Sequence, residues 1–252
     1  MQQCRVRPRG QGMIDTLTDA HERYFPPVEL ATPEGLVAVG GDLDSERLLQ
    51  AYRHGIFPWY NPGQPVLWWS PDPRTVLWPH RLHIARSLRK TLRRGEFRVT
   101  FDHAFENVID ACAGPRRRHP SGATWITSDM RAAYCRLHHA GHAHSVETWS
   151  GTTLVGGLYG VALGGAFFGE SMFSHATDAS KVALASLVDS LRSWGYTLID
   201  CQVGSSHLFS LGAEEIPRRD FITALKTALA LPGQTGPWQG HEIHGEIHGV
   251  AV

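Results

Sequence analysis

The sequence predicts an α+β protein of α/β-like character, in which a mixed β-sheet is flanked by helices. Two observations carry this prediction. Apolar, Gly-punctuated runs alternate with segments of helical periodicity through the second part of the chain, and a Pro- and Trp-rich stretch gives way to these segments near residue 75. We therefore expect a small N-terminal domain over 12–74, a larger domain over 75–232 and a flexible, polar, Gly-rich tail over 233–252.

Composition limits the classes of protein to consider. With 252 residues, 42% of them apolar and 19% charged, the chain can bury a full core. Its formal net charge is zero, so an anionic partner must be bound by a local patch rather than by an overall field. The four cysteines form no C-x-x-C pair, and we find neither an apolar signal segment nor a run near the ~18 apolar residues of a membrane span. We expect a cytoplasmic protein without membrane contact.

The N-terminal domain should contain one short helix, from Ser45 to His54. Leu48, Leu49 and Tyr52 fall near each other on one face of such a helix, and Gly55 would end it. An aromatic block follows, in which Trp59, Trp68 and Trp69 occur within eleven residues. Such side chains either fill a small core or stack on unpaired bases, and Trp59 is the one that we expect to be exposed.

A second helix is expected from His80 to Arg94, because Ile84, Leu88 and Leu92 recur every four residues. Its other faces are basic. Between Arg81 and Arg118 the chain has ten Lys or Arg residues against four Asp or Glu residues. Such a run is either a solvated surface or a patch that binds nucleic-acid phosphates, and the residues that would contact the phosphates are Arg86, Arg89, Lys90 and Arg93.

The sequence of the larger domain predicts two strands, a helix, a third strand and a final helix, in that order. The runs Leu154 to Tyr159 and Val161 to Phe168 suit a hairpin with a turn or bulge at Gly164 and Gly165. A helix capped by Asp178 or Ser180 should end at Gly195. The remaining elements are a strand, Tyr196 to Val203, and a helix from about Asp220 to Leu229.

Polar residues on this last strand form the first candidate site. Alternation along a strand puts Asp200 and Gln202 on one face. A buried carboxylate needs a partner, so we expect Asp200 to accept a hydrogen bond from the Gln202 side-chain amide, whose oxygen then points outward and can hold an incoming amine. The alternative is a satisfied polar pair at the end of a strand.

Glu170 is the second candidate, because it follows an apolar strand and should emerge at the end of the sheet. The neighbouring Phe167, Phe168 and Phe173 suggest a walled position, in which the carboxylate would suit a cationic ligand. The alternative is a solvated glutamate in a turn.

Histidines gather in two places, but neither spacing fits a zinc motif, and we expect no metal and no cofactor. The two groups are His138, His139, His142 and His144, and His241, His244 and His248.

Seven motifs in order along the chain resemble the leucyl/phenylalanyl-tRNA–protein transferase family, over roughly Phe25 to Leu231. They are Gly40-Gly-Asp-Leu, Gly55-Ile-Phe-Pro-Trp, Leu67-Trp-Trp-Ser-Pro-Asp-Pro-Arg, Thr124-Trp-Ile-Thr, Gly141-His-Ala-His-Ser, Gly169-Glu-Ser-Met-Phe-Ser and Leu198-Ile-Asp-Cys-Gln-Val. The resemblance implies a small N-terminal domain and a GNAT-like acyltransferase domain. It also implies transfer of Leu or Phe, and of Met as a further candidate, from aminoacyl-tRNA to the α-amino group of proteins that begin with Arg or Lys, which marks them for degradation under the N-end rule.

The resemblance also implies roles for single residues. Asp200, Gln202 and Glu170 would carry the chemistry, with Asp200 fixing Gln202, Gln202 holding the amine and Glu170 attracting the cationic acceptor. The terminal adenosine of the tRNA would be bound by Trp59, Trp125, Tyr52, Tyr134 and Phe167. The pocket for the transferred side chain would be walled by Leu158, Leu187 and Leu191.

Two rival functions are consistent with parts of the sequence. A coenzyme-A-dependent N-acyltransferase of the same fold would need a Gly-rich pyrophosphate loop, which the segment Ser174 to Ser180 does not offer. A non-catalytic RNA-binding module would explain the basic and aromatic residues, but it would leave Asp200, Gln202 and Glu170 without a task.

Overall fold

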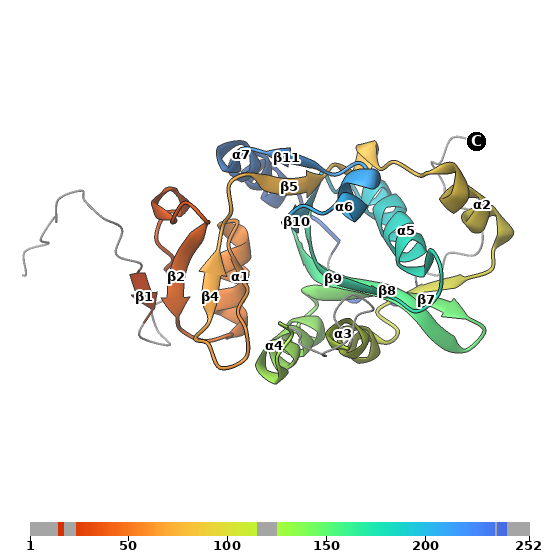
Figure 1. Cartoon of the computed structure of the whole chain (residues 1–252), viewed down its shortest axis with the longest axis horizontal. Coiled ribbons are helices and arrows are strands. Elements are labelled where there is room, and N and C mark those ends of the chain that lie inside the picture. Colours follow the sequence, from red (N-terminus) through yellow and green to blue (C-terminus); the bar gives the residue numbers. More distant parts are fainter. Residues whose placement is uncertain (1–14, 18–23, 115–124, 235, 241–252) are drawn as a thin grey trace, which may run out of the picture.

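The computed structural model describes residues 15–17, 24–114, 125–234 and 236–240, which form a mixed α+β structure with two sheets. The smaller sheet has the order β1-β2-β4-β3 and the larger one the order β11-β5-β10-β9-β8-β7-β6. The smaller sheet and helix α1 lie at one end of the molecule, beside β5, α7 and α4 (Figure 1). The expected α+β class is therefore observed.

The smaller sheet is built from short strands, and the first two of them are parallel. They are β1 (Asp15–Leu17), β2 (Leu36–Gly40), β3 (Phe57–Pro58) and β4 (Leu67–Trp69), and a 3-10 helix covers Val28–Leu30. Helix α1 (Ser45–Arg53) confirms the helix expected from Ser45, and the side chain of Asp44 caps it by accepting from the backbone N–H of Glu46 at 3.0 Å.

The larger sheet is antiparallel except for the pair β9 and β10. Its strands are β5 (Arg74–Leu77), β6 (Arg98–Phe101), β7 (Ala143–Ser150), β8 (Thr153–Leu163), β9 (Ala166–Ser174), β10 (Leu198–Gln202) and β11 (Glu214–Ile216). Helix α5 (Ala179–Ser193) lies on one face, and α3 (Phe105–Ala113) and α4 (Ser128–His139) lie on the other (Figure 1). Each face buries its own hydrophobic core.

The hairpin of the larger sheet is longer than expected. Strand β8 continues through Gly160, although its register with β9 shifts between Tyr159 and Gly160, and the turn lies at Gly164, where φ is +55°. A Cβ atom at Gly160 would lie 2.2 Å from the backbone oxygen of Phe168, so the absence of a side chain lets the two strands approach. The sequence suggested two short strands here because the glycines resemble breaks.

Helix α2 (Arg86–Arg94) is shorter than the helix expected from His80. Pro79–Arg81 form a separate 3-10 helix, and Ala85 is extended, with φ −61° and ψ 153°. The backbone N–H of His83 donates to the carbonyl of Leu211 at 2.9 Å, so tertiary contacts hold this connection outside the helix. Periodicity alone could not reveal that pairing.

The last elements largely follow the expectation. Strand β10 is confirmed in a shorter form than Tyr196 to Val203, and α7 (Arg218–Leu229) begins two residues before Asp220. Asp178 precedes α5, but its side chain accepts from Thr91 and Lys181 rather than from the helix backbone. A short helix, α6 (Ser206–Ser210), follows β10 and is capped by Ser205.

The segment expected to be a flexible tail is partly packed. Trp238 is fully buried, and its backbone N–H donates to the carboxylate of Asp102 at 2.8 Å. The polar, Gly-rich composition of the tail gave no sign that the Trp238 side chain is buried and fixes this segment. Residues 241–252 of the expected tail lie outside the described residues.

Among the described residues, no helix is long and apolar enough to cross a membrane.

Candidate active site

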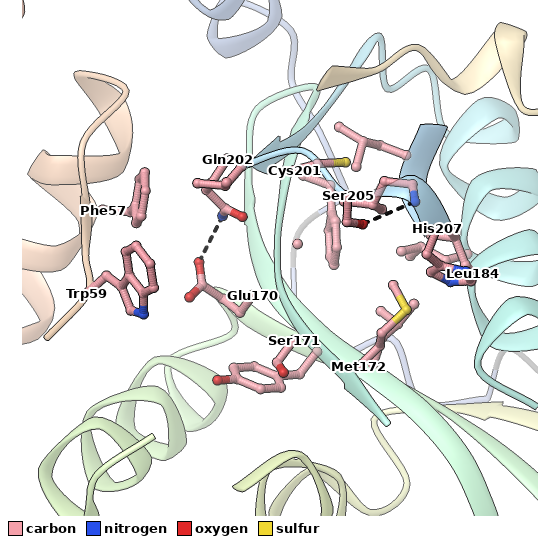
Figure 2. A pocket seen from close by; sticks show the side chains of 18 of the residues that line it. Phe57, Trp59, Glu170, Ser171, Met172, Leu184, Cys201, Gln202, Ser205 and His207 are labelled. Atoms are coloured by element: carbon pink, nitrogen blue, oxygen red, sulfur yellow. Dashed lines mark hydrogen bonds between the residues drawn. The ribbon is translucent and has the colours of Figure 1, made fainter. Parts of the chain in front are cut away.

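A cavity of about 430 Å³ opens between strand β3 of the smaller sheet and strands β8, β9 and β10 of the larger one. One end is apolar, and the other carries Glu170 and Gln202, which face each other near Phe57 and Trp59 (Figure 2). A cavity with an apolar body and a few converging polar groups is typical of a binding site for a small organic group. The residues that line it are Phe57, Pro58, Trp59, Trp125, Leu158, Tyr159, Phe167, Gly169, Glu170, Ser171, Met172, Leu184, Leu187, Ile199, Cys201, Gln202, Val203, Ser205, His207 and Leu208.

The carboxylate of Glu170 receives hydrogen bonds from three elements. The Tyr52 hydroxyl on α1 donates to Oε1 at 2.7 Å, and the Tyr134 hydroxyl on α4 donates to Oε2 at 2.8 Å. The side-chain nitrogen of Gln202 lies 3.3 Å from Oε1. Burial raises the pKa of Glu170 to about 7, although the hydrogen bonds from the two tyrosines act in the opposite direction. This carboxyl group can therefore exchange a proton near neutral pH.

Asp200 is held by a different partner from the one expected. Arg74 binds it through two hydrogen bonds, Nε to Oδ1 at 2.8 Å and Nη2 to Oδ2 at 2.6 Å, and both side chains are fully buried. Asp200 also accepts the backbone N–H of Gln202 at 3.0 Å, rather than its side-chain amide. The expectation that Asp200 and Gln202 share one strand face is wrong, because a bulge interrupts the register between them and Gln202 adopts a φ of +57°.

The arrangement around Asp200 orients Gln202. The left-handed backbone of Gln202 is unfavourable for a residue with a side chain, and the carboxylate of Asp200 stabilises it through the backbone N–H. The guanidinium of Arg74 in turn donates to the carbonyl of Gly55 at 3.1 Å and lies over the rings of Phe57 and Phe221. Asp200 itself does not line the cavity, so it acts on the site through Gln202.

Seven of the fifteen expected site residues line this cavity, and Glu170 and Gln202 are two of them. Trp59, Trp125 and Phe167 line it, as do Leu158 and Leu187. Trp59 is 47% exposed, as expected for the tryptophan outside the core. Besides Asp200, the other expected residues do not line the cavity. Tyr52 and Tyr134 lie behind Glu170, and Leu191 is buried in the core on which α5 packs. The basic residues Arg86, Arg89, Lys90 and Arg93 lie on α2.

Several residues that shape the site were not expected from the sequence. Arg74 is the most informative, because it begins the fully buried strand β5, and a buried charged residue is almost always paired. Apolar residues of the cavity wall, such as Leu184 and Leu208, have no signal that separates them from ordinary core residues.

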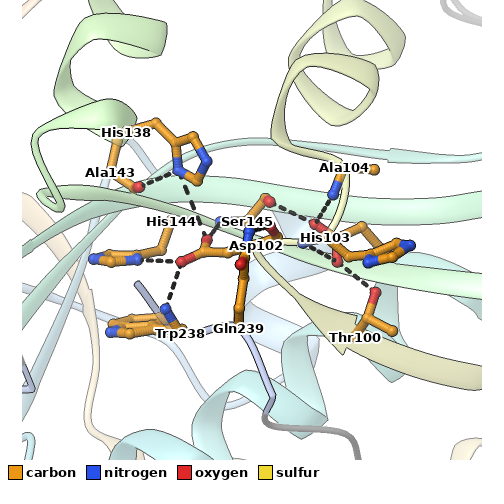
Figure 3. Close-up of polar contacts among 11 residues, drawn as sticks. Thr100, Asp102, His103, Ala104, His138, Ala143, His144, Ser145, Trp238 and Gln239 are labelled. Atoms are coloured by element: carbon orange, nitrogen blue, oxygen red, sulfur yellow. Dashed lines mark hydrogen bonds and ion pairs between the residues drawn. The ribbon is translucent and has the colours of Figure 1, made fainter. Parts of the chain in front are cut away.

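A second buried polar cluster surrounds Asp102, away from the cavity lining (Figure 3). Its carboxylate accepts from His144 Nδ1 at 2.8 Å and from the backbone N–H of Ser145 at 2.9 Å, besides Trp238. The imidazole of His144 stacks on Trp238 with the ring centres 3.8 Å apart. This cluster fixes the segment around Trp238 to the sheet.

The histidines of the first group are not arranged as metal ligands. Nδ1 of His138 donates to the carbonyl of Ala143 at 2.8 Å, and His144 pairs with Asp102. In the part of the chain that the structure describes, no group of three or more His, Cys, Asp or Glu side chains could hold a metal ion. His241, His244 and His248 lie outside that part.

Comparison with known families gives two consecutive matches. Residues 41–72 match the N-terminal domain of the leucyl/phenylalanyl-tRNA protein transferase family, and residues 76–226 match that family's transferase model.

Curated relatives agree with these matches. The chain is 61% identical over 216 residues to a protein of Azotobacter vinelandii named leucyl/phenylalanyl-tRNA–protein transferase, with 85% of this chain and 94% of the relative covered. It is 58% identical over 228 residues to the protein of the same name from Nitrosomonas europaea, with 90% and 95% covered. The structure of L-PGS from Bacillus licheniformis overlaps 68% of this chain and 54% of its own chain with a TM-score of 0.38 and 10% identity, a likeness too weak to support an argument.

Proposed function

Given that the chain belongs to the leucyl/phenylalanyl-tRNA protein transferase family, we propose that it is an aminoacyltransferase that moves Leu or Phe, with Met as a further candidate, from aminoacyl-tRNA to acceptor proteins. The acceptor group is the α-amine of a protein that begins with Arg or Lys, and the transfer marks that protein for degradation. The observation that carries this proposal is the cavity, whose apolar body ends at the facing side chains of Glu170 and Gln202.

The terminal adenosine of the tRNA binds against Trp59 and Trp125. Trp59 offers an exposed indole at the cavity, and stacking on an aromatic ring contributes about 1–3 kcal/mol per base. Phe167 is almost fully buried, so it contributes the floor rather than a stacking platform. Tyr52 and Tyr134 act on this site through Glu170 and not by touching the adenosine.

The transferred side chain occupies the apolar body of the cavity. Leu158 and Leu187 contribute to its wall, together with Met172, Leu184 and Ile199. Leu191 supports this wall from the core of α5. A wall of flexible and branched aliphatic side chains suits Leu, Phe and Met, because one methylene discriminates by only about 1–3 kcal/mol.

The acceptor amine meets the ester at Gln202. The side-chain nitrogen of Gln202 donates toward Glu170, which leaves the amide oxygen to accept an N–H of the amine. Asp200 and Arg74 hold the backbone of Gln202 in place, and Glu170 favours the cationic acceptor terminus. Since the ester is already activated, positioning of the amine supplies much of the acceleration.

Phosphates of the tRNA contact α2. Arg86, Lys90 and Arg93 are exposed on this helix, and Arg89 is half-buried. The larger domain, with its mixed sheet between helices, is proposed to have the GNAT-like acyltransferase fold, and the enzyme to act in the cytoplasm.

The proposal is tested by incubating the protein with leucyl-tRNA and a peptide that begins with Arg, followed by mass spectrometry of the peptide. We expect a mass gain of one leucyl residue, which prior RNase treatment abolishes. A matched peptide that begins with Glu should gain nothing. Gln202→Ala should lose transfer, and Gln64→Ala, at an exposed turn, should keep it. Absence of a gain, or a gain that resists RNase, rejects the proposal.

A further inference from the structure

Three groups from separate elements form a closed set of short contacts at the polar end of the cavity. The Tyr52 hydroxyl lies 2.7 Å from Oε1 of Glu170, and the Tyr134 hydroxyl lies 2.8 Å from Oε2. The two hydroxyl oxygens are also only 2.5 Å from each other. Each of the three groups therefore touches both of the others at hydrogen-bonding distance.

The number of protons in this set decides which of its contacts are hydrogen bonds. A hydrogen bond needs one proton, and each tyrosine hydroxyl has one to donate. If both hydroxyls donate to an ionised Glu170, the 2.5 Å contact between Tyr52 and Tyr134 contains no proton, and two oxygen lone pairs face each other. With a third proton on Glu170, all three contacts become hydrogen bonds in a ring. The arrangement is thus complete only when the carboxyl group is neutral.

We propose that Glu170 is the proton acceptor for the amine in this site, and that Tyr52 and Tyr134 are positioning residues whose ring with Glu170 holds the accepted proton. This inference rests on the proposed function, because it specifies how the acceptor amine becomes a nucleophile. It also refines the role of Glu170, which first attracts the cationic terminus and then takes a proton from it.

Atoms and charges balance in this reaction. The α-ammonium group loses one proton to the Glu170 carboxylate, so an N–H bond breaks and an O–H bond forms. The neutral amine attacks the ester carbonyl, the C–N bond forms, and the bond from the carbonyl carbon to the ribose oxygen breaks. A second proton of the nitrogen goes to that ribose oxygen, which leaves as a hydroxyl. Glu170 then returns its proton to solvent, for a net release of one proton per transfer.

The surroundings favour this exchange. The pKa of Glu170 is raised to about 7, mainly by burial, whereas an α-amine has a pKa near ~8, so the proton moves between nearly matched groups. The other titratable groups that act on this trio are Asp200 with Arg74, which stay paired with each other, and Tyr159 on β8. Burial raises the pKa of both Tyr52 and Tyr134 well above the usual value, so they stay protonated and serve as donors.

Glu170→Gln tests the inference, since glutamine keeps a donor and an acceptor for the ring but cannot take up a proton. Under single-turnover conditions with saturating acceptor peptide, we expect the transfer rate at pH 7 to fall about 100-fold, the lower end of proton-transfer effects. At pH 9 the amine is mostly neutral in solution, so the deficit should shrink below about 10-fold. An unchanged rate at saturation with a raised KM for the peptide would overturn the inference and leave Glu170 a purely attractive charge.

A direct titration gives the second readout. In full-length protein with 13C-labelled glutamate carboxyl groups, wild type should show one carboxyl resonance that titrates near pH 7 and is missing in Glu170→Gln. A Glu170 resonance that titrates below pH 5 overturns the inference. Tyr52→Phe and Tyr134→Phe, which each open the ring, should shift this resonance and lower the saturated rate. Because the titration needs no tRNA, a failed transfer by wild type would reject the proposed function and not the ring.

Discussion

At the scale of single residues, the buried ion pair of Arg74 and Asp200 is the anchor of the site. Both side chains are fully buried, and the planar guanidinium matches the carboxylate through two hydrogen bonds. The same carboxylate holds the backbone of Gln202. A substitution in this pair should therefore alter the cavity, although neither Arg74 nor Asp200 lines it. Stability and positioning are therefore coupled at Asp200.

The substitution Asp200→Asn should lower both the stability of the fold and the rate of transfer. Loss of the carboxylate leaves the guanidinium of Arg74 buried without its counter-charge, which we expect to lower the free energy of unfolding by about 3 kcal/mol. Urea denaturation followed by tryptophan fluorescence measures this change, and transfer to an Arg-peptide measures the loss of positioning. Asp220→Asn is the matched control, because Asp220 pairs with Arg219 at the surface and should change stability by less than about 0.5 kcal/mol. A variant with intact folding and an unchanged transfer rate contradicts the assignment of Asp200.

The candidate site residues Asp200 and Gln202 could be predicted from the sequence, but their hydrogen-bond partners could not. The motif around Asp200 and Gln202 suggested two side chains on one face, because alternation assumes a regular strand. The bulge and the positive φ of Gln202 depend on Arg74, which lies more than a hundred residues earlier in the chain. No local pattern carries that information.

At the scale of elements, two helices each contribute one hydroxyl group to the polar end of the site. Helix α1 supplies Tyr52 and α4 supplies Tyr134, and both meet Glu170 from β9. Helix α1 was predictable because its apolar face, cap and terminal glycine agree. Helix α2 is shorter than its periodicity predicts because its expected first turns are replaced by a connection that pairs with Leu211.

The basic face of α2 gives a prediction at this scale. Combined Arg86→Ala, Lys90→Ala and Arg93→Ala should make the dependence of log K on log salt for tRNA binding shallower by about 0.7–0.9 for each phosphate that the helix no longer neutralises. Filter binding of tRNA over a range of salt concentrations measures the slope. Stability should hardly change, since these side chains are exposed. Combined Arg219→Ala and Lys226→Ala on α7 is the control. An unchanged slope in the α2 variant removes this helix from the tRNA interface.

At the scale of the whole molecule, the larger sheet separates two cores, and residues of both cores line the cavity beside strand β3 of the smaller sheet. Trp238 joins the second core from outside the regular elements, and its ring lies 6.0 Å from that of Phe167, which lines the cavity. The composition of this segment predicts flexibility, but the packing of the Trp238 indole against His144 and other aromatic rings, with the hydrogen bond to Asp102, overrides it. The class of the fold was therefore predictable, but the extent of the folded chain was not.

The raised pKa of Glu170 should make the free energy of unfolding of the whole molecule depend on pH. A carboxyl group whose pKa rises from 4.5 to about 7 on folding stabilises the folded state fully below pH 4.5. This stabilisation is lost as the pH rises through about 7. Each pKa unit corresponds to about 1.4 kcal/mol, so the free energy of unfolding should fall by up to about 3 kcal/mol from this group between pH 5 and pH 8. Glu170→Gln removes the titration and should be more stable than wild type at pH 8, with little difference at pH 5.

Urea denaturation of the two proteins at a series of pH values measures this difference directly. Other groups contribute to the pH dependence of both proteins equally, so the difference between the curves isolates Glu170. Asp102 is one of them: burial raises its pKa, but hydrogen bonds from His144 and from two backbone N–H groups outweigh that effect and lower it, so its contribution is lost only as the pH falls below about 4. Glu215→Gln, at an exposed carboxylate, should follow the wild-type curve. Parallel curves for wild type and Glu170→Gln from pH 5 to pH 8 contradict a proton-exchanging carboxyl group in the cavity. A gap that opens with rising pH means that the protein gives up stability to keep this carboxyl group near neutral pH, where the acceptor amine needs it.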